Sequence, residues 1–296
     1  MKRLIECVPN FSEGRDASKV RAIVDAIAGA GVMMLGWESD ADHNRSVVTF
    51  AGEADAVMEA AIRGVGKAAE LIDLNAHQGV HPRVGAADVV PFVPLAEATI
   101  EQCIAIAHHA GSEIWSRFGV PVYFYEAAAK APERRRLERV RRRGFDGRAP
   151  DVGDIPAHPA AGASIVGARG ILIAFNVNLA TPDVEIAAAI ARKIRESSGG
   201  FRFVKAMGRY LISRACAQVS MNLTNYAEIP MNRLYASIEE TASALGTQVR
   251  ESQLVGLVPR RACEMAPEFF NRAENFDASR VIETRIATMK MSAGHD

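Results

Sequence analysis

Two spacings of apolar residues divide the chain into predicted helices and strands. Apolar residues recurring on one face predict helices over 17–30, 55–72, 99–118, 183–198 and 232–245. Short apolar runs rich in β-branched residues predict strands between these helices. The predicted strands are 4–9, 32–35, 46–51, 89–93, 122–125, 171–179, 203–210, 217–222 and 249–258.

The order of these elements indicates a repeated architecture. From residue 171 onward it is β-α-β-β-α-β, the split βαβ or ferredoxin-like arrangement. The first part opens in the same order and then adds a helix and a strand. The sequence therefore predicts an α+β protein with subdomains at 1–170 and 171–296, each an antiparallel sheet covered by helices. A cleft between two such layers is a natural ligand site.

Two stretches depart from this pattern. Residues 130–148 carry eight arginines between Arg134 and Arg148. A solvated helical face is the favoured interpretation, and a docking site for a polyanionic substrate tail is the alternative. Residues 149–167 are rich in proline, glycine and alanine, as in a linker or a ligand-contacting loop. The last few residues of the tail are expected to be disordered.

Composition narrows the function classes. The 296 residues contain 35 basic and 35 acidic side chains, and this balance gives no support to a nucleic-acid or membrane-surface partner. The four cysteines are far apart in sequence and are typical of reduced thiols in a cytoplasmic protein. The N-terminus lacks the apolar region of a signal peptide, and no apolar run is long enough to span a membrane.

The stretch at 71–94, LIDLNAHQGVHPRVGAADVVPFVP, concentrates the candidate chemistry. Its glycines and Pro82 exclude a regular helix, so its polar side chains are expected on a loop between two core elements. These polar side chains are His77, His81, Arg83 and Asp88.

These residue types favour proton-transfer chemistry on a small acidic substrate. His81 is the candidate general acid and base, because imidazole titrates near neutral pH. Arg45 or Arg83 could hold a substrate carboxylate by paired hydrogen bonds. Glu38 or Asp88 could orient the imidazole or offset a developing positive charge.

A metal site is the alternative at the same stretch. His77 and His81 have the spacing of two helical zinc ligands, and the loop at 38–45 offers further ligands. The broken helix between the two histidines argues against that site, so no metal is predicted. The sequence also lacks phosphate-binding and serine-hydrolase motifs.

Several stretches resemble the glutamate formimidoyltransferase family. They include ECVPNFSEG at 6–14, DHNRSVVTF at 42–50 and the stretch at 71–94. GARGILIAFNVNL at 167–179, AQVSMNLTNY at 217–226 and SQLVGLVP at 252–259 extend the resemblance over nearly the whole chain.

The resemblance implies a homodimeric one-carbon transferase of histidine degradation. It would move the formimino group of N-formimino-L-glutamate to tetrahydrofolate, the acceptor substrate, in a tunnel between two ferredoxin-like subdomains. His81 matches the catalytic histidine of the motif H-x-G-x-H-P-R-x-G, and Glu38 matches an acidic residue of the tunnel. The folate loop falls on Gly153, Asp154, Ile155, Pro156, Ala157, His158, Pro159, Ala160, Ala161 and Gly162.

Two alternatives stay open at this point. One is formyl transfer from N-formylglutamate to folate on the same scaffold. The other is a folate-binding module without catalysis. The presence of His81 and Arg83 favours an enzyme.

Overall fold

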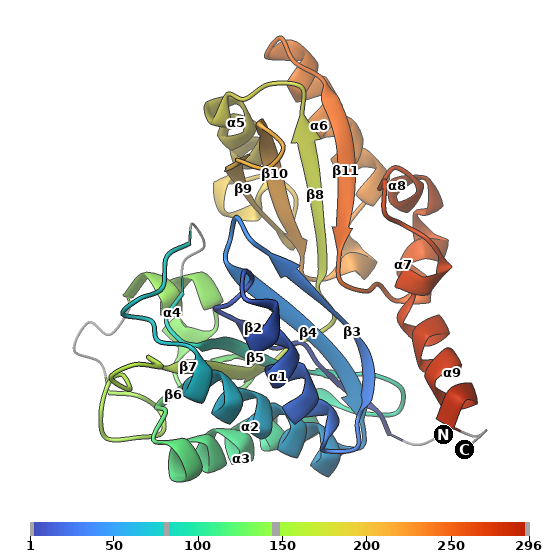
Figure 1. Cartoon of the computed structure of the whole chain (residues 1–296). Helices are drawn as coiled ribbons and strands as arrows, with labels where there is room; N and C mark the ends of the chain where they lie inside the picture. Colours follow the sequence, from blue (N-terminus) through green and yellow to red (C-terminus); the bar gives the residue numbers. More distant parts are fainter. Residues whose placement is uncertain (1–2, 80–82, 144–148, 294–296) are drawn as a thin grey trace. The chain divides into compact units, whose positions relative to one another are not determined.

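The computed structural model describes residues 3–79, 83–143 and 149–293 (Figure 1). The chain divides into two compact units, Met1–Gly170 and Ile171–Asp296. Each unit has its own sheet and its own apolar core. Strand pairing is mostly antiparallel, and the α+β class predicted from the sequence is confirmed.

The sheet of the first unit is built around its N-terminal segment. Strands β1 and β2 follow one another between β4 and β5 and are antiparallel to both. Strand β3 pairs with β4, whereas β7 and then β6 continue the sheet beyond β5. The strands are β1 (Ile5–Cys7), β2 (Asn10–Phe11), β3 (Met33–Asp40), β4 (Arg45–Gly52), β5 (Ala87–Pro94), β6 (Val122–Glu126) and β7 (Ser164–Ala168).

Three helices cover one face of this sheet: α1 (Ala17–Ala28), α2 (Ala54–Leu71) and α3 (Ile100–Phe118) (Figure 1). Their apolar faces join the alternate strand residues Val48, Phe50 and Phe92 in one core. Asp16 caps the start of α1 by accepting from the amides of Ser18 and Lys19.

The opposite face of the sheet is partly covered by α4 (Leu137–Arg143), which follows the short helix η1 (Pro132–Arg134). Leu137 and Val140 pack on a small cluster formed by Val84, Val89, Tyr125 and Ile165. The arginine-rich stretch therefore contributes apolar contacts to the fold, in addition to its charges.

Two predictions for the first unit need correction. Strand β7 begins inside the stretch at 149–167, where a linker or a loop was expected, and its pairings with β5 and β6 are parallel, so the sheet is not purely antiparallel. Strand β3 continues to Asp40, which places Glu38 on a strand instead of the polar loop expected at 38–45.

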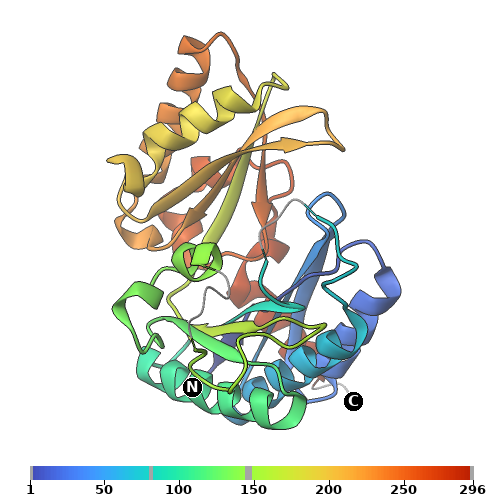
Figure 2. The ribbon, with the colours of Figure 1, turned by 90° about the vertical axis from the view of Figure 1, so that its left-hand side faces the viewer.

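The second unit has a four-stranded antiparallel sheet in the order β11-β8-β10-β9. Helices α5 and α6 pack on one face of it (Figure 2). Its elements are β8 (Ile173–Leu179), α5 (Val184–Ile194), η2 (Glu196–Ser198), β9 (Val204–Leu211), β10 (Cys216–Leu223), η3 (Tyr226–Glu228), α6 (Met231–Ala244) and β11 (Val249–Val255). The tail adds α7 (Arg260–Met265), α8 (Pro267–Asn271), η4 (Ala278–Arg280) and α9 (Ile282–Ala293). Residues 294–296, where disorder was expected, lie outside the described residues.

Two predictions from composition can be compared with the structure. All four cysteines are free thiols, as expected. Burial raises the pKa of the Cys103 thiol to about 12. Among the described helices, none is both long enough and apolar enough to cross a lipid bilayer.

Candidate active site

The topology brings the predicted site residues that the structure describes in the first unit to one edge of its sheet. Because β2 is antiparallel to both β4 and β5, and β7 is parallel to β5, the strands β4, β5 and β7 all begin at that edge. Arg45 is the first residue of β4, and the loop at 72–86 leads into β5. The loop at 153–162 leads into β7, so segments far apart in sequence meet there.

The predicted catalytic residue belongs to a segment that the described residues flank on both sides. Val80, His81 and Pro82 lie outside the described residues, and the role of His81 stays a prediction. The residues on either side, Gly79 and Arg83, are described and define how the segment is anchored.

Arg83 closes the segment that contains His81. Its guanidinium donates to Nδ1 of His77 and to the carbonyl oxygen of Gly79. Burial lowers the pKa of Arg83 from its usual value, the Asp88 carboxylate opposes this shift, and the charge of Arg15 adds to it. An arginine with these contacts holds the two ends of the loop together.

The contact with Arg83 also indicates the tautomer of His77. A guanidinium has no acceptor, so Nδ1 of His77 must carry the lone pair. The other ring nitrogen, Nε2, then carries the proton and lies 3.2 Å from the carbonyl oxygen of Asn44, to which it donates. With both nitrogens engaged, His77 is a structural group of the loop and is poorly suited to bind a metal.

Asn44 connects this loop to the start of α1. Its backbone has φ of 47°, the left-handed conformation that asparagine tolerates better than most residues. Its Oδ1 accepts from the amide of Gly14 at 3.0 Å, and its Nδ2 donates to the carbonyl of Gln78 at 2.9 Å. Gly79 permits this contact, because a Cβ there would lie 2.6 Å from the carbonyl oxygen of His43.

Arg45 and Glu38 lie on the face of the sheet opposite α1, α2 and α3. Val48 and Phe50 belong to the core under those helices, so Val47 and Arg45 point the other way. Glu38 is the cross-strand partner of Val47 and shares that face. Arg45 donates to Oδ1 of Asn10, and its pKa is lowered to about 10 by burial and by the charge of Arg141.

Asp88 occupies a β-bulge, where β5 has one residue more than β2 between the pairs Asn10–Val89 and Phe11–Ala87. Its Oδ1 accepts from the amide of Val84 at 2.8 Å, and its Oδ2 lies 2.5 Å from Nη2 of Arg141. The Asp88 carboxylate, a candidate to orient the imidazole of His81, therefore forms an ion pair with Arg141 on α4.

This pair corrects the interpretation of the arginine-rich stretch as a solvated face. Arg141 pairs with Asp88, and Arg134 pairs with Asp151, whose Oδ2 also accepts from the amide of Phe124. Arg135, Arg136 and Arg139 are exposed. Residues 144–148 lie outside the described residues. The stretch is thus partly solvated and partly fixed to the sheet by two ion pairs.

The predicted folate loop is tied to the loop at 72–86 by main-chain hydrogen bonds. The amide of Leu74 donates to the carbonyl of Ala160, and the amide of Ala86 donates to that of Ala161. Within the loop, Nδ1 of His158 accepts from the amides of Ala160 and Ala161. Residues 154–156 are exposed, although the Tyr123 hydroxyl donates to the carbonyl of Pro156 at 3.1 Å, whereas Ala161 and Gly162 are buried.

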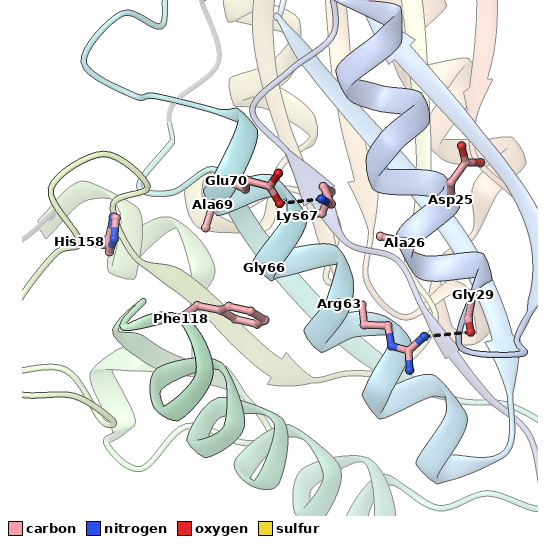
Figure 3. Close-up of a pocket in the computed structure, with 10 residues that line it drawn as sticks. All are labelled: Asp25, Ala26, Gly29, Arg63, Gly66, Lys67, Ala69, Glu70, Phe118 and His158. Atoms are coloured by element: carbon pink, nitrogen blue, oxygen red, sulfur yellow. Dashed lines mark hydrogen bonds and ion pairs between the residues drawn. The ribbon is translucent and has the colours of Figure 1, made fainter.

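A shallow hollow of about 690 Å³ lies on the helix-covered side of this unit (Figure 3). Side chains of α1, α2 and α3 line it, together with His158 from the loop. The ion pair Lys67–Glu70 and the hydrogen bond from Arg63 to the carbonyl of Gly29 lie along its wall. Of the predicted site residues that the structure describes, His158 alone lines this hollow, so the hollow does not unite the site.

The described ranges, 3–79, 83–143 and 149–293, contain no group of three or more histidine, cysteine or carboxylate side chains placed to hold a metal ion. His81, one of the two histidines considered as ligands, is not among these residues. His43 is in contact with Asp40, with Nδ1 2.9 Å from Oδ2.

Sequence similarity assigns the chain to a family. The N-terminal subdomain of the formiminotransferase domain matches residues 4–169, and the formiminotransferase domain matches residues 174–293. Glutamate formimidoyltransferase of Thermoplasma acidophilum is 42% identical over 295 residues, with 96% of this chain and 97% of that protein covered. The protein of the same name from Streptococcus pyogenes is 41% identical, and the match covers 94% of this chain and 96% of that protein. Formimidoyltransferase-cyclodeaminase of Gallus gallus is 39% identical, and the match covers 93% of this chain and 53% of that protein. The chain therefore belongs to the formiminotransferase family.

Proposed function

We propose that this protein is a glutamate formimidoyltransferase. It transfers the formimino group of N-formimino-L-glutamate to tetrahydrofolate, giving 5-formiminotetrahydrofolate and L-glutamate. The observation that carries the proposal is the sequence identity of 41–42% to two proteins of that name, over nearly the full length of this chain and of each of those proteins. The family match over both units supports it.

The reaction needs a group that moves one proton. The secondary amine at position 5 of the folate attacks the formimino carbon, and a C–N bond forms. The bond from that carbon to the glutamate nitrogen then breaks, and its electron pair stays on that nitrogen. The proton leaves the folate amine and ends on the glutamate amine. We assign this transfer to His81, acting first as base and then as acid.

The substrate carboxylates need cations at fixed positions, because a buried carboxylate without a partner is costly. Arg45 and Arg83 are proposed to bind them, and Glu38 to face the cationic reaction centre. Arg45 begins β4 at the same sheet edge as the loop at 72–86, which contains Arg83. The loop at 153–162 is proposed to contact the folate, and its hydrogen bonds to the loop at 72–86 support a shared site.

The finer description of the fold belongs to the same proposal. Both units are proposed to be ferredoxin-like. The order β11-β8-β10-β9 supports this for the second unit, and the order β3-β4-β1-β5 supports it for the first, with β7 and β6 as an extension. The folate tunnel, the homodimer and a cytoplasmic location stay predictions, as does the lack of a metal, nucleic-acid or membrane partner.

A transfer assay with both candidate donors tests the function. Purified protein is mixed with tetrahydrofolate and either N-formimino-L-glutamate or N-formylglutamate, and the folate product is identified by its absorbance and mass. We expect 5-formiminotetrahydrofolate from the first donor and no product from the second. If only the formylated folate forms, the protein is instead an N-formylglutamate-dependent formyltransferase. Folate binding without product from either donor would indicate a non-catalytic module.

Arg83→Lys tests the substrate-binding role of Arg83. Lysine keeps the charge but loses the planar fork that binds a carboxylate at two points. We expect the KM for formiminoglutamate to rise about tenfold, roughly 1.4 kcal/mol, with a smaller change for tetrahydrofolate. Steady-state kinetics with each substrate varied, beside a melting curve, measure this. A lowered melting temperature with both KM values unchanged would limit Arg83 to its contacts with His77 and Gly79.

A further inference from the structure

We propose that Arg141 is a positioning residue for the transfer reaction. It acts through Asp88, whose carboxylate fixes the backbone at Val84, three residues after His81. The inference rests on the proposed function, because it concerns the loop that carries the proposed acid and base. It gives the arginine-rich stretch a defined role that its composition does not reveal.

The Asp88 carboxylate contacts both α4 and the loop that leads into β5. Oδ2 of Asp88 lies 2.5 Å from Nη2 of Arg141, and Oδ1 accepts from the amide of Val84 at 2.8 Å. The Asp88 side chain is 3% exposed and that of Arg141 is 15% exposed. One buried carboxylate thus joins α4 to the loop that leads into β5.

The charge of Asp88 requires a cation nearby. A carboxylate with so little exposure is strongly destabilised unless a cation and hydrogen-bond donors replace its water. Arg141 supplies the cation and Val84 supplies a donor. The charges of Arg45 and Arg83 also act on Asp88, but Arg141 is its ion-pair partner, and without it the hold of Asp88 on the amide of Val84 would weaken.

Val84 in turn fixes the backbone next to Arg83. Its amide is bound by Asp88, and its carbonyl accepts from the amide of Ala163 at 2.9 Å. The peptide groups on both sides of Val84 are therefore fixed, which sets the direction of the chain at Arg83. A reacting group that moves by about 1 Å can lose about 10²-fold in rate.

The helix that carries Arg141 is itself fixed to the sheet. Arg141 lies on a short helix whose Leu137 and Val140 pack in the same cluster as Val84. The pair Arg134–Asp151 anchors the chain just before that helix. The same cluster contains Val89, Tyr125 and Ile165 of the sheet, so the helix that carries Arg141 is also held by strands outside the loop.

The test is a set of single and double variants with full kinetics. For Arg141→Met we expect kcat to fall about tenfold or more, with both KM values within about twofold of wild type. Arg139→Met is the matched control, since Arg139 is exposed on the same helix, and it should leave kcat unchanged. Unchanged kcat in Arg141→Met, or a raised donor KM with normal kcat, would overturn the positioning role.

A double-variant cycle identifies the route of the effect. Asp88→Asn keeps an oxygen for the Val84 amide but removes the charge. If Arg141 acts through Asp88, Asp88→Asn/Arg141→Met should be no slower than the slower single variant. Losses that multiply would show that Arg141 acts elsewhere, for example on the substrate. The double variant removes both charges of the ion pair, so no Asp88 carboxylate is left without Arg141, and it remains testable if Arg141→Met fails to fold.

Chemical rescue separates local positioning from general stability. Guanidinium ion at millimolar concentration should restore part of the kcat of Arg141→Ala, because it can pair with Asp88 in the vacated space. Urea at the same concentration should not. Lack of rescue by guanidinium in folded protein would contradict the ion-pair route. A wild-type protein without transfer activity would instead refute the proposed function itself, which keeps the two failures distinct.

Discussion

Replacing His81 with alanine is expected to lower kcat for formimino transfer by about 10²- to 10⁴-fold, the usual contribution of a general acid and base. The proton that leaves the folate amine and the proton that reaches the glutamate nitrogen would both lose their carrier. The loss should appear in kcat and leave the KM values nearly unchanged, because an interaction needed only in the transition state is removed.

His109→Ala is the control for this prediction, since His109 is an exposed histidine on α3. It should have wild-type kinetics. Added imidazole should restore part of the activity of His81→Ala if the missing group is a proton carrier. A kcat near that of wild type in His81→Ala would remove this residue from the mechanism.

Gly85→Ala is expected to destabilise the first unit by about 3 kcal/mol, at the upper end of the range for overpacking. A Cβ at this position would lie 1.9 Å from the carbonyl oxygen of Ala163 and 2.8 Å from its carbon. These are backbone atoms at the start of β7, so no side-chain rotation can relieve the clash. The loop and the strand would have to separate, although Val84 and Ala163 are hydrogen-bonded there.

Thermal unfolding measures this effect. For a unit of this size, about 3 kcal/mol corresponds to a decrease in Tm of roughly 6–12 °C. Gly170→Ala is the matched control, because a Cβ there would meet nothing within 4 Å. A melting temperature of Gly85→Ala equal to that of the control would show that the loop and β7 can separate at little cost.

The periodic elements of the fold could be predicted from the sequence. Helices α2, α3 and α6 follow apolar spacings that only one regular structure satisfies. Strand β7 was missed because it is a five-residue strand, SIVGA, buried on both sides, which leaves no alternation of polar and apolar residues to detect. The extension of β3 to Asp40 was missed because polar residues at the end of an outer strand resemble a loop.

The site could be predicted as a set of residues but not as a set of contacts. Its glycines and histidines are close together in the sequence, so their loop was recognised from local pattern. The partner of Asp88 is 53 positions away in a stretch dominated by charge. Which of several arginines is buried depends on how Leu137 and Val140 pack, and that information is carried by the tertiary structure.

The central position of the N-terminal strands has a consequence for how the protein folds. Because β1 and β2 pair with β4 on one side and β5 on the other, the first residues made cannot complete their pairings until residue 94 has been synthesised. Such long-range pairing raises contact order, and sheets of this kind fold in about milliseconds to seconds. Until then, the early hydrophobic segment is exposed and open to aggregation. Expression at low temperature, or with a chaperone that binds nascent chains, should therefore increase the yield of folded protein.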